Sequence, residues 1–206
     1  VLECKINGVD SCIACVYGPN RYDGDYYDLL RSSLRHAYNH NRMVILGGDW
    51  NSIVLNLPLS INPDLIGSKN IPNKINGDKI RQLMKDFDLF DPFREKNPAG
   101  KAYTYKHFSD KRVAKSRLDF FLINRPEKLG YKYFNCNILP KETTILDHRP
   151  IIMTLNKHNN KDRKSIGNKK LVIPNLTTIS QEAGIIIVSL SALETAYDHL
   201  MSTGFY

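Results

Sequence analysis

Several apolar, strand-like runs of this chain are flanked by short polar segments, and this pattern constrains the fold more than any other feature. The polar segments are residues 17–20, 47–51, 116–119 and 147–150. They contain carboxylate, amide, phenol and imidazole side chains. In the run 11–17 both alternating sets of side chains are largely apolar, which is typical of a strand covered on both faces. The sequence therefore predicts a covered sheet with polar groups at its strand ends.

Two stretches between these runs have the spacing of amphipathic helices. Apolar side chains recur at helical intervals in residues 27–38 and again in residues 78–87. A polar, proline-containing stretch at 52–76 predicts a long surface loop. Further strands are expected at 43–46, 103–108, 118–124, 133–139 and 150–155. Strands interleaved with two helices indicate an α/β protein.

The size and charge of the chain limit its domain organisation and the kinds of partner that it can bind. It has 206 residues, of which 42% are hydrophobic, so it can bury one substantial core. We expect one domain over residues 1–156 and a basic linker with an unassigned tail over 157–206. The formal net charge of +8 suits a polyanionic partner. Because the chain begins with Val1 on the approach to a strand, we also expect it to be part of a longer reading frame.

The four cysteines are expected to be reduced side chains of the core. Cys4, Cys12 and Cys15 crowd into one predicted strand region, where mutual disulfides would be awkward. No second cysteine pair follows Cys12 and Cys15 at the spacing of a zinc site. These features favour a reducing, intracellular compartment. The longest apolar stretch, 183–193, is shorter than the ~20 residues that span a bilayer, so no membrane partner is expected.

The polar segments also match a known family in their order and wording. The motifs are Val16-Tyr17-Gly18-Pro19-Asn20, Leu46-Gly47-Gly48-Asp49-Trp50-Asn51, Tyr103-Thr104-Tyr105, Ser116-Arg117-Leu118-Asp119-Phe120-Phe121 and Asp147-His148-Arg149-Pro150-Ile151. Over residues 1–156 the chain resembles the endonuclease/exonuclease/phosphatase superfamily, which includes deoxyribonuclease I. Within it, the likeness is closest to the endonuclease domain of LINE-type (non-long-terminal-repeat) retrotransposons. The resemblance implies a nuclear protein with a four-layer α/β sandwich that is incomplete at the N-terminus.

The resemblance implies a catalytic role for five residues. Asp49 would orient or deprotonate the attacking water, and Asn51 would donate to the scissile phosphate. His148 would contact the phosphate, and Asp119 would hold its imidazole in the useful tautomer. Tyr17 would place its hydroxyl on the phosphate or the leaving group. The structural alternative for the segment at Asp49 is an Asx-turn after a strand.

The resemblance further implies cation and nucleic-acid contacts. Asp147 would bind Mg²⁺, with Mn²⁺ as the alternative ion, directly or through water. Asn20 would contact the nucleic-acid backbone. Arg117 precedes Asp119 by two residues, so it would pair with that carboxylate or face phosphate, and Arg149 is equally ambiguous. DNA is therefore the expected partner.

The chain departs from the superfamily pattern at two places. Nothing before Tyr17 supplies the asparagine and the metal-binding glutamate of the family, since Glu3 and Glu182 lie in the wrong context. Leu146 stands where the family usually has a serine. Three hypotheses follow. The first is a Mg²⁺-dependent endonuclease that nicks DNA, with a reverse transcriptase domain in the full-length protein. The second is a catalytically inactive, nucleic-acid-binding remnant of such a domain. The third is a phosphatase of the same superfamily.

Overall fold

The computed structural model describes most of the chain up to residue 157 and three strands beyond it. The described residues are 1–6, 8–54, 62–68, 73–109, 112–124, 131–140, 148–157, 170–173, 177–180 and 185–188. Asp147, the predicted cation ligand, lies outside them. Within these ranges, no helix combines the length and the apolar character needed to cross a membrane.

Helices are interleaved with strands up to α3, and within the described residues only strands follow; this mixture confirms the predicted α/β class. The helices are α1 (Gly24–Asn39), α2 (Lys74–Asp86) and α3 (Pro92–Lys96). The strands are β1 (Leu2–Ile6), β2 (Val9–Tyr17), β3 (Met43–Asp49), β4 (Leu65–Ile66), β5 (Leu89–Phe90), β6 (Tyr105–Ser109), β7 (Arg112–Ser116), β8 (Asp119–Asn124), β9 (Tyr131–Ile138), β10 (Ile151–Lys157), β11 (Lys170–Ile173), β12 (Thr177–Ser180) and β13 (Ile185–Val188).

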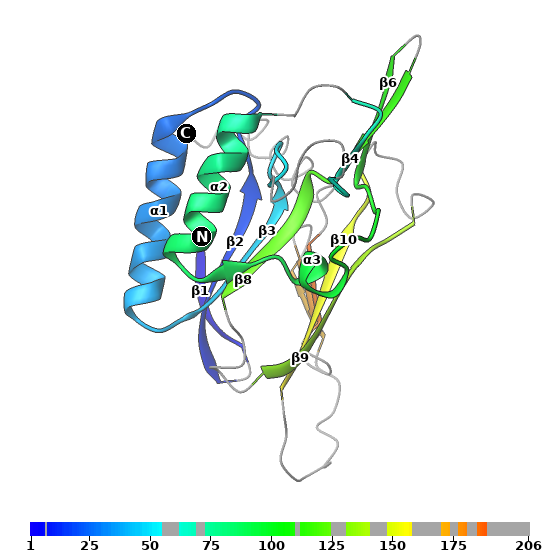
Figure 1. Cartoon of the computed structure of the whole chain (residues 1–206). Coiled ribbons are helices and arrows are strands. Elements are labelled where there is room, and N and C mark those ends of the chain that lie inside the picture. Colours follow the sequence, from blue (N-terminus) through cyan, green and yellow to red (C-terminus); the bar gives the residue numbers. More distant parts are fainter. Residues whose placement is uncertain are drawn as a thin grey trace, which may run out of the picture.

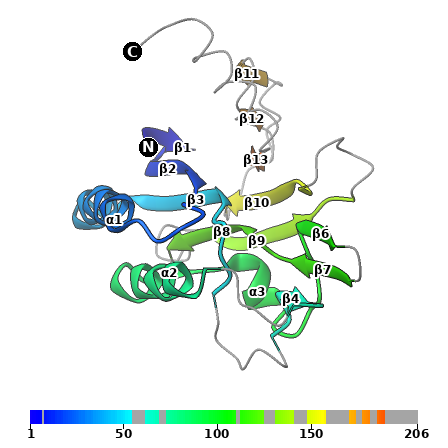
Figure 2. The same cartoon turned by 90° about the horizontal axis from the view of Figure 1, so that it is seen from above.

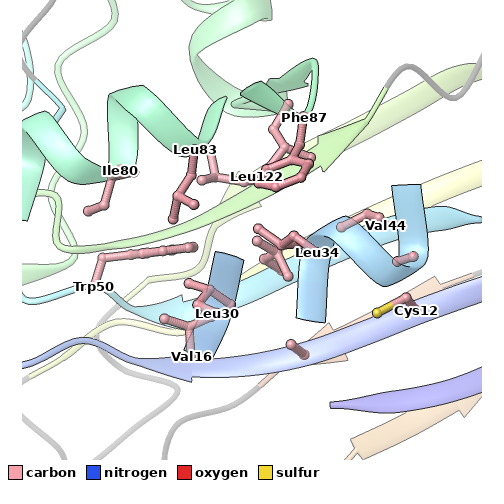
Figure 3. Packing of buried hydrophobic residues seen from close by; sticks show 14 of the residues in the cluster. Cys12, Val16, Leu30, Leu34, Val44, Trp50, Ile80, Leu83, Phe87 and Leu122 are labelled. Atoms are coloured by element: carbon pink, nitrogen blue, oxygen red, sulfur yellow. The ribbon is translucent and has the colours of Figure 1, made fainter. Parts of the chain in front are cut away.

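The first sheet carries the predicted site residues on its central strands. Its strand order is β1-β2-β3-β8-β5, with β2 parallel to β3 and β8 antiparallel to β3. Helices α1 and α2 lie side by side over one face of this sheet (Figure 1). Their apolar stripes pack against buried strand residues such as Val16 and Leu122, together with the fully buried Trp50 (Figure 3). This packing covers the helix-facing side of the sheet.

The second sheet covers the opposite side. Its strand order is β11-β12-β13-β10-β9, and every neighbouring pair is antiparallel. Seen from above, it forms a second layer beside the first sheet (Figure 2). Ile45 and Phe121 of the first sheet, Phe93 of α3 and Met153 of the second sheet share one buried core. Both faces of β3 and β8 are therefore covered. In β2, the strand for which two covered faces were expected, Cys15 and Tyr17 are exposed.

A small third sheet, with strand order β4-β7-β6, lies at one end of the molecule. Its strands β6 and β7 form a hairpin that projects away from the two layers (Figures 1 and 2). Neither β4 nor β7 was predicted. Strand β4 is two residues long and lies in the stretch expected to be a loop, and β7 is too short and too basic to give a strand signal. Short strands of this kind depend on their partners more than on their own sequence.

Replacing Gly48 with alanine should destabilise the protein and displace Asp49. Gly48 has a φ of 146°, and an added Cβ would lie 2.0 Å from the carbonyl oxygen of Val16 in the adjacent strand. We expect the free energy of unfolding to fall by about 2 kcal/mol or more, measured by urea denaturation with circular dichroism. Gly24→Ala is the matched control, because Gly24 begins α1 and alanine favours a helix. Equal, small effects of both changes would contradict this assignment.

Candidate active site

Three of the predicted site residues form one row across three neighbouring strands. The parallel register of β2 and β3 places Tyr17 opposite Asp49, and the antiparallel register of β3 and β8 places Asp49 opposite Asp119. Directly paired residues project from the same face of a sheet. Asp49 and Asp119 are buried, whereas Tyr17 is 63% exposed. The row therefore presents two carboxylates and a phenol and runs from the interior towards solvent.

An Asx-turn holds Asn51 beside Asp49. The backbone N–H of Asn51 donates to Asp49 Oδ1 at 2.8 Å, and the φ of Asn51 is 47°. The side-chain amide of Asn51 donates to the carbonyl oxygen of Gly18, just past the end of β2, at 2.8 Å. The turn expected as the structural alternative is thus present, and it also fixes Asn51 between two strand ends. An amide nitrogen carries two hydrogens, of which Gly18 takes one.

Two asparagines at the start of α2 support this segment. Asn73 donates from its side chain to the carbonyl oxygen of Asn51, and Asn76 donates to that of Pro19, both at 2.9 Å. Neither was predicted, because α2 begins at Lys74 and not at residue 78, and polar residues hid its first turn. Asn20 follows the half-buried Pro19 and is exposed, and its contact with nucleic acid stays a prediction.

His148 reaches the row through Asp119. Its Nδ1 lies 2.8 Å from Asp119 Oδ2. Because an ionised carboxylate can only accept, Nδ1 carries the shared hydrogen. The imidazole also contacts the ring of Tyr105, with ring centroids 4.8 Å apart. The structure therefore brings together the pair that the resemblance implied, while the catalytic roles of both residues stay predictions.

The donor atoms of Asp49, Asp119 and His148 fit a divalent cation. One such atom from each residue lies within 4.8 Å of the other two. Asp119 Oδ1 is buried and has no hydrogen-bond partner among the described residues. Buried polar atoms normally have a hydrogen-bond partner, so this oxygen is a good candidate to bind a cation. Two carboxylates suit a hard cation such as Mg²⁺ or Mn²⁺.

Thr104 connects the row to the His148 segment, and it was not predicted as a site residue. Its buried hydroxyl accepts hydrogen bonds from the backbone N–H groups of Leu118 and Asp119, each at 3.0 Å. Its carbonyl oxygen accepts from the N–H of Arg149, the residue after His148, at 2.8 Å. The available signal was a threonine between two tyrosines at the start of a predicted strand. Thr104 thus holds both partners of the carboxylate–imidazole pair through their backbones.

Arg117 does not reach the row, which corrects the expectation that it pairs with Asp119 or faces phosphate. Its side chain is 4% exposed and binds Asp64 through Nε at 2.5 Å and Asp91 through Nη2 at 2.6 Å. Arg117 precedes β8, so strand alternation does not place it beside Asp119. Burial alone would lower the pKa of its guanidinium, but the attraction of Asp91 and the contacts with Asp64 raise that pKa above its usual value.

Arg149 joins two backbone segments in this structure. Its Nε donates to the carbonyl oxygen of Leu139 at 2.7 Å, and its Nη1 donates to that of Tyr103 at 3.2 Å. The residue is half-buried. These contacts assign Arg149 a structural part next to His148, and its contact with nucleic acid stays a prediction.

Replacing Thr104 with valine should loosen the start of β8 at nearly constant side-chain volume. The N–H groups of Leu118 and Asp119 would lose their acceptor, and each unsatisfied group costs about 1–3 kcal/mol. We expect a lower free energy of unfolding and faster amide hydrogen exchange at these two positions, measured by urea denaturation and nuclear magnetic resonance. Thr104→Ser keeps the hydroxyl and is the control. Parent-like exchange in the valine variant would show that the hydroxyl does not hold the strand.

Comparisons with known proteins show similarity in sequence and in fold. No family model matches the chain. Over 109 residues it is 28% identical to a Xenopus laevis protein named "Transposon TX1 uncharacterized 149 kDa protein", a match that covers 52% of this chain and 7% of that protein.

Three solved structures share the fold. A 3′–5′ exonuclease of Neisseria meningitidis is 20% identical with a TM-score of 0.52, and the match covers 71% of this chain and 60% of that one. An AP endonuclease of Leishmania major is 17% identical with a TM-score of 0.52, covering 72% and 51%. The catalytic domain of Xenopus laevis APE2 is 21% identical with a TM-score of 0.54, covering 78% and 55%.

The chain spans between half and two thirds of the length of these solved structures and a small part of the transposon protein. The similarity in fold confirms the expected α/β architecture of the deoxyribonuclease I type. This chain is therefore similar in fold to three solved structures named as an exonuclease, an AP endonuclease and a catalytic domain, and similar in sequence over 109 residues to a transposon protein.

Proposed function

We propose that this chain is a nuclease domain that hydrolyses phosphodiester bonds in DNA with a divalent cation, Mg²⁺ being the expected ion. The observation that carries the proposal is the row of Tyr17, Asp49 and Asp119, with the imidazole of His148 on Asp119. The solved structures that share the fold are named as an exonuclease, an AP endonuclease and a catalytic domain.

Each residue of the site would have a different part in the hydrolysis of the phosphodiester. Asp49 would orient the attacking water and accept its proton. The amide of Asn51 would donate to a phosphate oxygen on which negative charge grows. In its protonated form His148, held by Asp119 at Nδ1, would donate from Nε2 to another such oxygen. Tyr17 is exposed and so can place its hydroxyl against the leaving group.

A divalent cation would be held beside the same row. Asp119 Oδ1 and the carboxylate of Asp49 are the described donors, and Asp147, next to His148 in sequence, is the further ligand that we propose. When bound, the cation supplies positive charge that neutralises the phosphate. The buried Asp119 Oδ1, which has no hydrogen-bond partner within the described ranges, supports this assignment.

Charge and sequence support DNA as the substrate and a retrotransposon as the source. The net charge of +8 favours a polyanion, and binding that rests on phosphate contacts weakens as salt increases. The similarity to a transposon protein points the same way. The reaction would nick one DNA strand in the nucleus and leave a 3′-hydroxyl that primes a reverse transcriptase elsewhere in the full-length protein.

Nicking of supercoiled plasmid by the purified chain tests this function directly. Open-circle DNA should form with Mg²⁺ and not with EDTA. Asp49→Asn and His148→Gln should each lower the rate by about 10²–10⁴-fold, because each removes a group that moves or donates a proton. Asp147→Ala tests the proposed cation ligand. Asp86→Asn is the matched control, since Asp86 pairs with Arg31 on the helical surface.

The other outcomes separate the alternatives. Equal nicking by every variant would identify a contaminating nuclease. A folded chain that binds DNA without nicking it would favour the inactive remnant. The observation that supports this alternative is that the chain covers only part of each solved structure. Hydrolysis of p-nitrophenyl phosphate without nicking would favour the phosphatase.

Cation binding has its own test that needs no catalysis. Asp119→Asn should weaken Mn²⁺ affinity by about 10–100-fold, because it removes a charge and converts one carboxylate oxygen to an amide. Free Mn²⁺ would be measured by electron paramagnetic resonance during a titration. The exposed Asp78→Asn serves as the control. Unchanged affinity in the Asp119 variant would place the cation away from the row.

A further inference from the structure

A second group of charged side chains, two of them buried and two half-buried, lies next to the start of β8. Asp64, Asp91, Arg94 and Arg117 form an ion cluster at a cavity of about 170 Å³. Arg117 lies at its centre, because it binds both carboxylates and its guanidinium lies over two aromatic rings. Those rings are Phe93 and Phe120, with guanidinium-to-centroid distances of 5.3 and 5.2 Å.

The cluster joins three parts of the chain that are distant in sequence. Asp64 precedes β4, and its carboxylate forms ion pairs with both Arg117 and Arg94. Asp91 caps α3, since its Oδ1 accepts from the backbone N–H groups of Phe93 and Arg94 at 3.0 Å. The backbone N–H of Arg117 donates to the carbonyl oxygen of Asp64 at 3.0 Å. Arg117 is therefore fixed by both its side chain and its backbone.

The residues next to Arg117 hold the active-site row. The carbonyl oxygen of Leu118 accepts from the N–H of Trp50, which follows Asp49, at 2.9 Å. The N–H groups of Leu118 and Asp119 both donate to Thr104. The segment anchored by Arg117 thus sets the backbone positions on which both carboxylates of the row depend.

We propose that Arg117 is a positioning residue that, through the ion cluster, fixes Asp119 in hydrogen-bonding distance of His148. The inference rests on the proposed function, because it concerns the same site. According to this proposal, Arg117 positions an active-site residue in addition to stabilising the fold. The planar guanidinium of Arg117 binds two carboxylates and contacts two aromatic rings at once, and a lysine ammonium cannot reproduce that geometry.

The test substitutes Arg117 without removing its charge. In Arg117→Lys, the start of β8 should shift and the contact between Asp119 and His148 should weaken. The readout is the imidazole tautomer of neutral His148, observed by long-range ¹H–¹⁵N nuclear magnetic resonance and assigned with His148→Gln. In the parent the Nδ1–H tautomer should dominate, and in the variant its ratio to the Nε2–H tautomer should fall by about tenfold.

A second variant and a matched control keep the test decisive. Asp91→Asn keeps the shape of the α3 cap but weakens the hold on Arg117, and it should shift the tautomer ratio in the same direction. Arg31→Lys makes the identical chemical change in the exposed ion pair with Asp86 and should leave the ratio unchanged. The proposal is overturned if folded Arg117→Lys and Asp91→Asn keep the parent ratio. It is also overturned if both variants fail to fold, because the cluster would then serve stability.

Nicking kinetics separate this proposal from the proposed function. If the parent nicks DNA, Arg117→Lys should lower kcat by about 10²-fold and change KM by less than about threefold, since displaced catalytic groups affect the reaction more than binding. A parallel rise in KM would count against positioning. If the parent does not nick DNA, the proposed function fails, while the tautomer ratio still decides the role of Arg117.

Discussion

Strand register is the constraint on which the site depends. Strands β2 and β3 are parallel, so their carboxyl ends lie at one edge, and the antiparallel β8 begins at that same edge. A slip of one residue in either pairing would turn one functional side chain to the opposite face. Trp50 opposes such a slip, because its backbone N–H binds the carbonyl oxygen of Leu118 and its indole N–H binds that of Phe120. One buried residue thus fixes β3 against β8 directly beside the carboxylates.

Buried and partly buried hydrogen bonds to backbone groups complete the arrangement. Asn51, Asn73 and Asn76 bind carbonyl oxygens of the turns that follow β2 and β3, and Thr104 binds the first N–H groups of β8. Such bonds are stronger in a region that excludes water, and they are costly to leave unmade. The functional side chains therefore rest on turns that are fixed at several points.

Local sequence patterns predicted β2, β3, β6, β8, β9 and β10, the two longer helices and the polar groups at strand ends, because strand ends and apolar stripes are short-range features. They did not predict β1, β4, β5, β7 or the three strands β11–β13 in the expected tail. The partners of Arg117 were not predictable in this way. Asp64 and Asp91 lie 53 and 26 residues from it, and only the packing of α3 and β4 brings them together. Its spacing from Asp119 suggested a shared face, but the strand begins two residues later. Asn76 was missed for a related reason, because polar residues in the first turn of α2 mask its start.

The closeness of the two central carboxylates has a consequence for the protein without its cation. Asp49 and Asp119 have donor atoms within 4.8 Å of one another in a buried setting, where like charges repel strongly. The strand pairing that brings them together must overcome this repulsion during folding. A bound cation would relieve it and so raise the stability of the folded chain by an amount that grows with the logarithm of the cation concentration above the Kd. The closeness of the two carboxylates, which suits the chain to bind a cation, therefore also destabilises its fold when no cation is bound.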